Sequence, residues 1–296
     1  MTRKIIRFAW RTALVLVILF IVLLLVLDRF IQFRMDNEEI TDWFGKKGVP
    51  VEINYYETHG RKLRYIATGK DTSATILFIH GAPSSSTYYR DYLTDSLLLN
   101  RAHLIAVDRP GYGYSGLANP ITSVEEQARI IRPLLDSLQR VHHPVVVVGA
   151  SYGTTIACRI AMDYPEVVDG LVLVAPALAP RQEKTYWFSP MIESPLVHWI
   201  IPRMLQTANA EKLAHPKELE AMLPLWPRIK VPVHYLQGAN DELVYTSNAP
   251  FAREKMVNVP FLSIDLIPGR GHLIAFNERE RIRNSILQML SRARQY

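Results

Sequence analysis

The stretch Val145-Val146-Val147-Val148-Gly149-Ala150-Ser151-Tyr152-Gly153 carries the strongest fold signal in this chain of 296 residues. Its four valines predict a strand buried on both faces, and residues 154–163 after it have a helical pattern. The turn between strand and helix must be tight, and glycine at 149 and 153 avoids side-chain clashes there. Ser151 would then point outward at the N-terminus of a helix, whose dipole favours developing negative charge. This context predicts that Ser151 is a nucleophile.

A serine of ordinary reactivity needs a base, and that base needs an acid to orient it. Two further apolar runs, 231–236 and 261–267, predict strands. Asp241 lies in the loop after the first and His272 in the loop after the second. The carboxyl ends of parallel strands share one edge of a sheet, so both side chains are expected at the edge that carries Ser151. We therefore expect His272 to act as general base and then acid, with Asp241 as its orienter.

Other candidate acids and bases are weaker. Glu242 is adjacent to Asp241 but points differently in any regular loop, and Asp265 lies inside a predicted strand. The single cysteine, Cys158, excludes an intramolecular disulfide and any multi-cysteine metal site, and we expect it to be buried. Most other histidines are better explained as turn, strand or surface residues, at positions 80, 103, 142, 143, 198, 215 and 234.

The negative charge that develops on a substrate carbonyl needs hydrogen-bond donors. The predicted strand 74–79 leads into the loop His80-Gly81-Ala82-Pro83. We expect the backbone N–H of Ala82 in this loop and that of Tyr152, after the nucleophile, to form an oxyanion hole. A second glycine-rich stretch, 108–116, suits a tight turn from strand to loop, and its Asp108 and Arg109 are expected to be structural.

Short apolar runs alternate with helical patterns along the chain. The runs are rich in β-branched residues and nearly continuous in hydrophobicity, which is typical of strands in a parallel sheet. They occupy residues 74–79, 103–107, 145–148, 171–174, 231–236 and 261–267, after a hairpin at 51–58 and 62–67. The alternation predicts an α/β fold with a doubly wound, mostly parallel, eight-stranded sheet. Residues 178–230 are too many for a simple crossover, and their aromatic residues and prolines predict an inserted helical lid.

Residues 1–34 form an apolar and basic N-terminal segment. Residues 13–27 carry no charge, and apolar flanks extend the run to about residues 10–30, which predicts one transmembrane helix that acts as an uncleaved anchor. Because the uncharged run covers only roughly 22 Å, a cleaved signal peptide is the alternative, but no small-residue cleavage site follows it. Residues 35–50 are polar, with glycine and proline, and predict a linker to a domain at 51–296.

The net charge of +6 is concentrated in the N-terminal segment, where six basic residues stand against Asp28 alone. The rest of the chain is therefore near neutral, so the basic excess predicts no nucleic-acid partner. More basic residues precede the apolar run than follow it. This bias predicts that the N-terminus is cytoplasmic and that the catalytic domain lies on the outer, extracytoplasmic side of a membrane.

Five motifs in order resemble those of the α/β-hydrolase superfamily, in the branch that carries a lid. They are HGAP at 80–83, DRPGYGYS at 108–115, GASYG at 149–153, GAND at 238–241 and GH at 271–272. The resemblance covers residues 50–292. Ser84 departs from it, since many relatives have glycine after the proline of the first motif.

The resemblance implies a serine hydrolase that cleaves a carboxylic ester or thioester through an acyl-enzyme, with no metal or organic cofactor. Haloalkane dehalogenases and epoxide hydrolases of this branch carry aspartate at the position of Ser151, which argues against both. The apolar lid and the anchor favour a small, lipid-like acyl substrate. One alternative is a membrane-tethered binding protein without activity, and another is an iminopeptidase-type peptidase. Such a peptidase would hold an amino group with lid carboxylates, for which the candidates are Glu183, Glu193, Glu211, Glu218 and Glu220.

Overall fold

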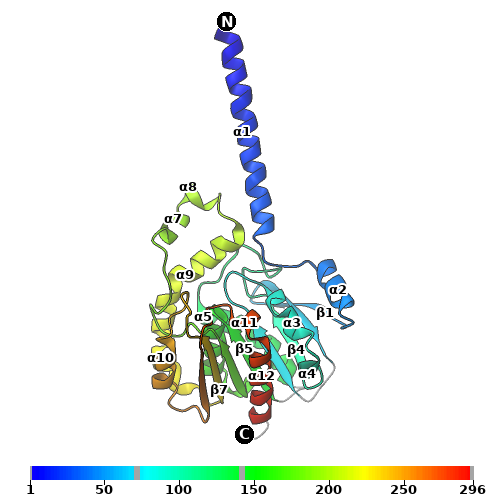
Figure 1. Cartoon of the computed structure of the whole chain (residues 1–296), viewed down its shortest axis with the longest axis vertical. Helices are drawn as coiled ribbons and strands as arrows, with labels where there is room; N and C mark the ends of the chain where they lie inside the picture. The colour runs from blue at the N-terminus through cyan, green and yellow to red at the C-terminus, as the bar shows by residue number, and fades with distance from the viewer. Residues whose placement is uncertain (1, 70–73, 140–143, 294–296) are drawn as a thin grey trace.

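The computed structural model of the chain describes residues 2–69, 74–139 and 144–293. Helix α1 (Thr2–Phe30) extends alone from one end of a compact body (Figure 1). The side chains of its apolar stretch, Ile5–Phe30, are not buried by the rest of the chain. Within the described ranges, it is the one helix whose length and composition suit a membrane span.

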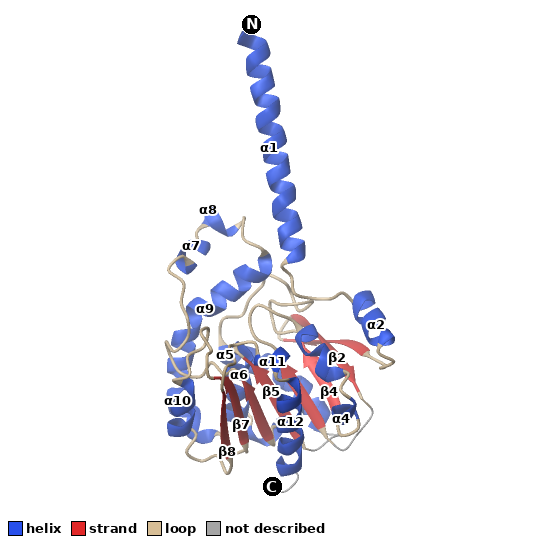
Figure 2. Ribbon diagram, in the orientation of Figure 1, coloured by secondary structure: helices blue, strands red, loops and turns tan. Residues whose placement is uncertain are grey.

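The body is built on one eight-stranded sheet with the strand order β1-β2-β4-β3-β5-β6-β7-β8 (Figure 2). β1 and β2 form the expected hairpin, β2 pairs antiparallel with β4, and all other neighbours are parallel. The expectation of an eight-stranded, mostly parallel sheet is confirmed. The strands are β1 (Glu52–Thr58), β2 (Arg61–Thr68), β3 (Thr75–Ile79), β4 (His103–Val107), β5 (Val145–Ala150), β6 (Gly170–Val174), β7 (Val233–Gly238) and β8 (Leu262–Ile267).

Helices connect the strands and pack against the sheet (Figure 2). Those outside the insertion after β6 are α2 (Asn37–Lys46), α3 (Arg90–Leu93), α4 (Ser96–Leu99), α5 (Val124–Gln139), α6 (Tyr152–Asp163), α10 (Asn248–Lys255), α11 (Ile274–Asn277) and α12 (Arg279–Ala293). Short 3-10 turns are η1 (Ser86–Tyr89) and η2 (Pro165–Val167).

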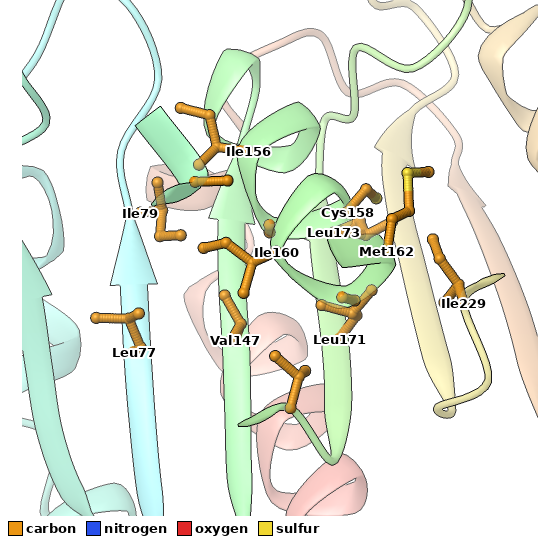
Figure 3. Packing of buried hydrophobic residues seen from close by; sticks show 14 of the residues in the cluster. Leu77, Ile79, Val147, Ile156, Cys158, Ile160, Met162, Leu171, Leu173 and Ile229 are labelled. Atoms are coloured by element: carbon orange, nitrogen blue, oxygen red, sulfur yellow. The ribbon is translucent and has the colours of Figure 1, made fainter. Parts of the chain in front are cut away.

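The valines of β5 pack into two hydrophobic cores, one on each face of the sheet. Val145 and Val147 join the core that contains α5 and α6, whereas Val146 and Val148 join the core that contains α2 and α12. Figure 3 shows Val147 beside Ile160 of α6. All four valine side chains are fully buried, and each such burial contributes roughly 1.5–3 kcal/mol. The near-continuous hydrophobicity of this strand follows from its two covered faces.

The chain between β6 and β7 forms a helical insertion at the position expected for a lid. It contains α7 (Ser189–Ile192), α8 (Pro195–His198), α9 (Arg203–Met222) and the 3-10 turn η3 (Leu223–Arg228). α7 and α8 project from the same end of the body as α1 (Figure 1). The insertion therefore lies at the end of the molecule from which the apolar helix leaves.

Residues 35–50 differ from the expected linker, because α2 forms within them. Asp36 caps this helix by accepting from the backbone N–H of Glu39, and the Glu39 carboxylate accepts from the N–H of Asp36 in return. Ile40 and Phe44, one helical turn apart, are fully buried against the α12 core. Glycine and proline at the C-terminal end of the segment end the helix and do not mark a flexible chain. The segment is part of the body.

Candidate active site

Ser151 occupies the turn between β5 and α6 with a backbone φ of +50°. A residue other than glycine rarely adopts this conformation, so the surrounding packing must hold it in place. Its N–H donates to Val174 O of the neighbouring strand at 2.9 Å. A Cβ on Gly149 would lie 2.7 Å from Gly153 O, and a Cβ on Gly153 would collide with Ile79 O. Both glycines are therefore required by close backbone approach, as the sequence predicts.

The structure brings the three distant candidate side chains together at the carboxyl edge of the sheet. His272 Nε2 lies 3.1 Å from Ser151 Oγ, and His272 Nδ1 lies 2.9 Å from Asp241 Oδ2. Asp241 follows β7 and His272 follows β8, so each lies in the loop expected for it. The three side chains form one hydrogen-bonded line.

Asp241 is held from two sides. Its Oδ1 accepts from the backbone N–H of Leu243 at 3.0 Å and of Val244 at 2.9 Å, which leaves Oδ2 for His272. Burial by itself would raise the pKa of this carboxyl, but the hydrogen bond and charge of His272 and the two N–H donors together lower it. The group is therefore held as a carboxylate, which can only accept.

This arrangement assigns the imidazole tautomer. Because the Asp241 carboxylate only accepts, His272 Nδ1 must carry a proton and donate it. In the neutral ring Nε2 is then the acceptor, and it faces the hydroxyl of Ser151. The imidazole can therefore remove the proton of that hydroxyl.

The loop 80–83, which we call the oxyanion loop, packs directly against the turn at Ser151. A Cβ on Gly81 would lie 3.0 Å from both Ala150 O and Ser151 Cβ. Gly81 O faces His80 Nδ1 at 2.7 Å and accepts from Arg109 Nη2 at 3.1 Å. In a trans peptide the C=O and the following N–H point in opposite directions. The N–H of Ala82 is therefore aimed away from Arg109.

Arg109 lies in a fully buried network that also reaches the insertion. Its guanidinium donates to both oxygens of Glu211 in α9, at 2.7 and 3.0 Å, and its Nε donates to His80 O at 2.8 Å. Tyr112 also donates to Glu211, at 2.6 Å. The pKa of His80 lies well below its usual range because of burial and the neighbouring Arg109 charge. The network therefore links α9 to the oxyanion loop.

Asp108, which precedes Arg109 in the chain and is expected with it to be structural, is also buried. It accepts from Arg64 Nε at 2.9 Å, from the N–H of Ser86 at 2.7 Å and from the N–H of Tyr114 at 2.8 Å. A carboxylate with three donors around it organises the loops near the sheet edge. Both residues have the structural contacts expected of them, but the link between Arg109 and α9 has no signal in the sequence.

A cavity of about 480 Å³ opens above Ser151 and His272. Its wall combines the oxyanion loop, including Ala82, with side chains of the insertion. Most of that wall is apolar, from Tyr186, Phe188, Ile192 and Leu205. Such a cavity suits an acyl chain, with Ser151 at its floor.

One polar region of this wall contains Glu183 and Lys212. Lys212 Nζ lies 2.7 Å from one carboxylate oxygen of Glu183, and His215 Nδ1 lies 2.8 Å from the other. Burial opposes ionisation of Glu183, but the charges and hydrogen bonds of these two neighbours outweigh it and lower its pKa to about 2. Glu183 is therefore a paired carboxylate and is not free to hold a substrate amine.

The other lid carboxylates are also engaged. Glu211 pairs with Arg109, Glu193 accepts from Asn209 at 2.6 Å, Glu218 accepts from the N–H of Val124 at 2.8 Å, and Glu220 pairs with Arg181 at 2.7 Å. Of the five, Glu183 alone lines the cavity over Ser151.

The weaker candidates lie away from Ser151 or have other partners. Asp265 is in β8 beside His234, at 3.3 Å. The two ring nitrogens of His272 face Asp241 and Ser151, so Glu242 is not its hydrogen-bond partner. Cys158 is fully buried, which raises its pKa above the usual range. His80 lies in the loop after β3, as expected, and His215 lies in α9, and both are fully buried and hydrogen-bonded. His142 and His143 lie outside the described residues. Among the described residues, no group of three or more His, Cys, Asp or Glu side chains could hold a metal ion.

The sequence profile of the alpha/beta hydrolase family matches residues 76–283. The chain belongs to this family. A curated relative of this α/β-hydrolase is a monoacylglycerol lipase of Xenopus laevis, which is 26% identical over 232 residues. That match covers 76% of this chain and 66% of the lipase. The curated relatives first matched are covered over about two thirds of their length or less.

Solved structures share the fold of this α/β-hydrolase. A putative aryl esterase from Burkholderia cenocepacia has a TM-score of 0.68 and 22% identity, over 83% of this chain and 100% of the esterase. A membrane phospholipase A, described as a bacterial virulence factor, has a TM-score of 0.64 and 19% identity, over 100% of both chains. At these identities the likeness concerns the fold.

Proposed function

We propose that this α/β-hydrolase is a serine hydrolase that cleaves a carboxylic ester or thioester of a lipid-like acyl group through an acyl-enzyme. The observation that carries the proposal is the hydrogen-bonded line Asp241–His272–Ser151 at the floor of a largely apolar cavity. A hydroxyl, a base and an orienting acid in this order are the groups that nucleophilic acyl transfer requires.

The mechanism follows from the hydrogen-bond directions. His272 Nε2 removes the proton of Ser151 as Oγ attacks the substrate carbonyl, and Asp241 stabilises the imidazolium that results. The N–H groups of Ala82 and Tyr152 receive the oxyanion; Tyr152 is the first residue of α6, so its N–H has no partner inside the helix. The imidazolium then protonates the leaving alcohol or thiol. Water, deprotonated by His272, releases the acid and restores Ser151.

Two observations favour a lipid-like ester over an amine-bearing peptide. The cavity wall is mostly apolar, and the only lid carboxylate in it, Glu183, is already paired with Lys212 and His215. The relative named as a monoacylglycerol lipase is consistent with an acylglycerol substrate. A dehalogenase is also among the relatives, but the resemblance assigns it an aspartate nucleophile, and this chain has Ser151.

A labelling experiment tests the activity. A fluorophosphonate probe reacts with activated serines, and we expect it to label the wild-type chain and to leave Ser151→Ala unlabelled. Ser151→Ala should also lose hydrolysis of both a monoacylglycerol and a short-chain ester. Absence of labelling in the folded wild-type chain would support a non-catalytic binding protein instead.

We also infer that α1 is retained as a membrane anchor, with the N-terminus cytoplasmic and the catalytic domain outside. The support is the apolar stretch Ile5–Phe30 and the excess of basic residues before it. External protease should digest the body in intact cells. If the body is protected from the protease while α1 is still present, the body lies in the cytoplasm and the proposed orientation is wrong.

A further inference from the structure

The insertion carries a cluster of apolar side chains that the body leaves exposed. We call residues 186–199 the lid tip. Trp187 and Leu196 are each 83% exposed, and Trp199 is 61% exposed. Tyr186, Phe188 and Met191 are also exposed. The rings of Tyr186 and Trp187 contact that of Phe188, and large apolar side chains that gather on a surface in this way mark an interaction site.

The position of the lid tip indicates what covers it. In Figure 1, α7 and α8 reach the height of the last turns of α1 along the long axis of the molecule. The start of α9 is also joined to α1. Arg203 donates to Asp28 from its backbone N at 2.8 Å, from Nε at 3.0 Å and from Nη2 at 2.7 Å.

The geometry of a membrane span places this junction at a bilayer surface. The 26 residues of Ile5–Phe30 span about 39 Å as a helix, more than the roughly 30 Å of a hydrocarbon core. Asp28, near the end of that stretch, then lies at the headgroup level, where a charged pair is solvated. The lid tip precedes Arg203 in the chain and reaches the same level along the long axis of the molecule (Figure 1). Tryptophan is enriched at such interfaces.

The same segment also forms part of the cavity wall. Tyr186, Phe188 and Ile192 line the cavity above Ser151, while Trp187 faces solvent beside them. The lid tip therefore presents apolar side chains both to solvent and to the cavity above Ser151.

We infer that the lid tip docks into the bilayer surface beside α1 and admits acyl substrate to the cavity directly from the membrane. This inference rests on the proposed function and on membrane insertion of α1. The occupant of the exposed apolar surface is lipid, because α1 brings the bilayer to that end of the molecule. The Asp28–Arg203 contacts hold the start of α9 beside the end of α1, and so determine how deep the lid tip lies relative to the membrane.

The first test compares two substrates with the full-length chain in phosphatidylcholine vesicles. One substrate is a long-chain monoacylglycerol in the same vesicles, and the other is a short-chain water-soluble ester. The variant combines Trp187→Ser, Leu196→Ser and Trp199→Ser. We expect hydrolysis of the vesicle substrate to fall by about tenfold or more, equivalent to roughly 1.4 kcal/mol, while hydrolysis of the soluble ester stays near the wild-type rate.

The matched control is Val257→Ser. Val257 is 65% exposed and precedes β8, at the opposite edge of the sheet from Ser151. This variant should leave both rates unchanged. Equal loss on both substrates in the lid-tip variant, or no loss on either, would overturn the inference. If the wild-type chain hydrolyses neither ester, the proposed function fails, and docking is decided by the second test.

The second test measures docking without activity. A background of Trp10→Phe and Trp43→Phe removes the tryptophans of α1 and α2, and Trp226, the remaining tryptophan outside the lid tip, is fully buried. Vesicles of brominated phosphatidylcholine should then quench emission, and the quenching should disappear when Trp187→Phe and Trp199→Phe are added. Unquenched emission, with α1 resistant to carbonate extraction, would overturn the inference. So would a lid-tip variant that converts a detergent-solubilised dimer to a monomer, since the surface would then bind a second copy.

Discussion

Single residues decide how the site is charged and oriented. Asp241 divides its two oxygens between His272 and the backbone N–H groups of Leu243 and Val244, so the carboxylate cannot rotate without breaking three hydrogen bonds. Ser151 depends in the same way on a backbone conformation at φ +50° that its glycine neighbours make possible. The chemistry therefore depends on the tautomer and orientation of one imidazole.

Asp241→Asn should lower kcat by about 10²–10⁴ while leaving the fold intact. The asparagine amide can keep its oxygen on the two backbone N–H groups and present NH₂ to His272. His272 would then carry its proton on Nε2 and could not accept one from Ser151. Steady-state hydrolysis of a soluble ester measures the loss.

The control for this substitution is Asp265→Asn, because Asp265 also lies beside a histidine, His234, in β8. Its activity should match the wild type. Near wild-type turnover in folded Asp241→Asn would remove Asp241 from the mechanism.

Acylation should be slower at about pH 5 than at about pH 8, because a general base that has gained a proton cannot accept another. Protonated His272 cannot accept the proton of Ser151. The lowered pKa of Asp241 keeps that carboxylate charged over this range, so its protonation adds nothing to the acid limb. Burst-phase kinetics on an activated ester follow acylation directly, and a flat profile there would contradict the role of His272.

At the scale of elements, α9 is tied to the oxyanion loop. Glu211 of α9 binds Arg109, and Arg109 binds the carbonyls of His80 and Gly81. Fixing Gly81 O fixes the opposite direction of the Ala82 N–H. The insertion therefore contributes to the orientation of a proposed oxyanion donor as well as to the cavity wall.

Glu211→Gln should lower kcat by about tenfold or more with little change in KM, because removing one donor of an oxyanion hole costs about 10²–10³ and misorienting it costs part of that. It should also destabilise the fold by about 3–5 kcal/mol, since the Arg109 charge is left buried. Separate kcat, KM and thermal-unfolding measurements distinguish the two effects.

A milder variant and a surface control complete this comparison. Tyr112→Phe removes one hydrogen bond to Glu211 but keeps the ion pair, so its loss of kcat should be smaller. Glu126→Gln breaks an exposed pair with Arg129 and should change neither kcat nor the stability of the fold. A stable Glu211→Gln with unchanged kcat would show that α9 does not orient the loop.

Helix α2 should behave as part of the core. Phe44→Ala removes a fully buried ring and should lower the free energy of unfolding by about 3–5 kcal/mol in a denaturant titration of the chain. Lys46→Ala, on the exposed side of the same helix, should stay within about 0.5 kcal/mol. A loss below about 1 kcal/mol for Phe44→Ala would restore the description of residues 35–50 as a linker.

Across the whole molecule, a cluster of partly buried charges connects the insertion to the sheet. The Glu183 carboxylate joins Lys212 and His215 of α9 to the chain that leaves β6. Its pKa is lowered from 4.5 to about 2, so the folded state favours the ionised form. That preference stabilises the fold fully above pH 4.5 and is lost as pH falls toward 2.

The Glu183→Gln variant should therefore be less stable than the wild type at neutral pH, by about 3 kcal/mol. The difference should shrink as pH falls from 4.5 toward 2, where the carboxyl of the wild type is also protonated. Thermal unfolding against pH measures it. Glu220→Gln, which breaks an exposed pair with Arg181, serves as control, and a pH-independent difference for Glu183→Gln would contradict the assignment.

Local sequence patterns predicted the sheet, the turn at Ser151 and the loops that carry Asp241 and His272. These features depend on local rules: hydrophobic continuity of buried strands, glycine where backbones approach, and the shared edge of parallel strands. The apolar N-terminal helix is predicted from composition in the same way.

The contacts between distant parts of the chain are visible only in the folded molecule. Arg109 and Glu211 are 102 positions apart, and Asp28 and Arg203 are 175 apart. No local pattern marks either pair, because each contact depends on how the insertion packs over the sheet edge. The packing of α2 could not be predicted from the sequence either. Its two buried side chains, Ile40 and Phe44, are too few to give a helical pattern of apolar residues in a polar segment. Long-range packing therefore decided how the insertion, the loop 80–83 and α1 are joined.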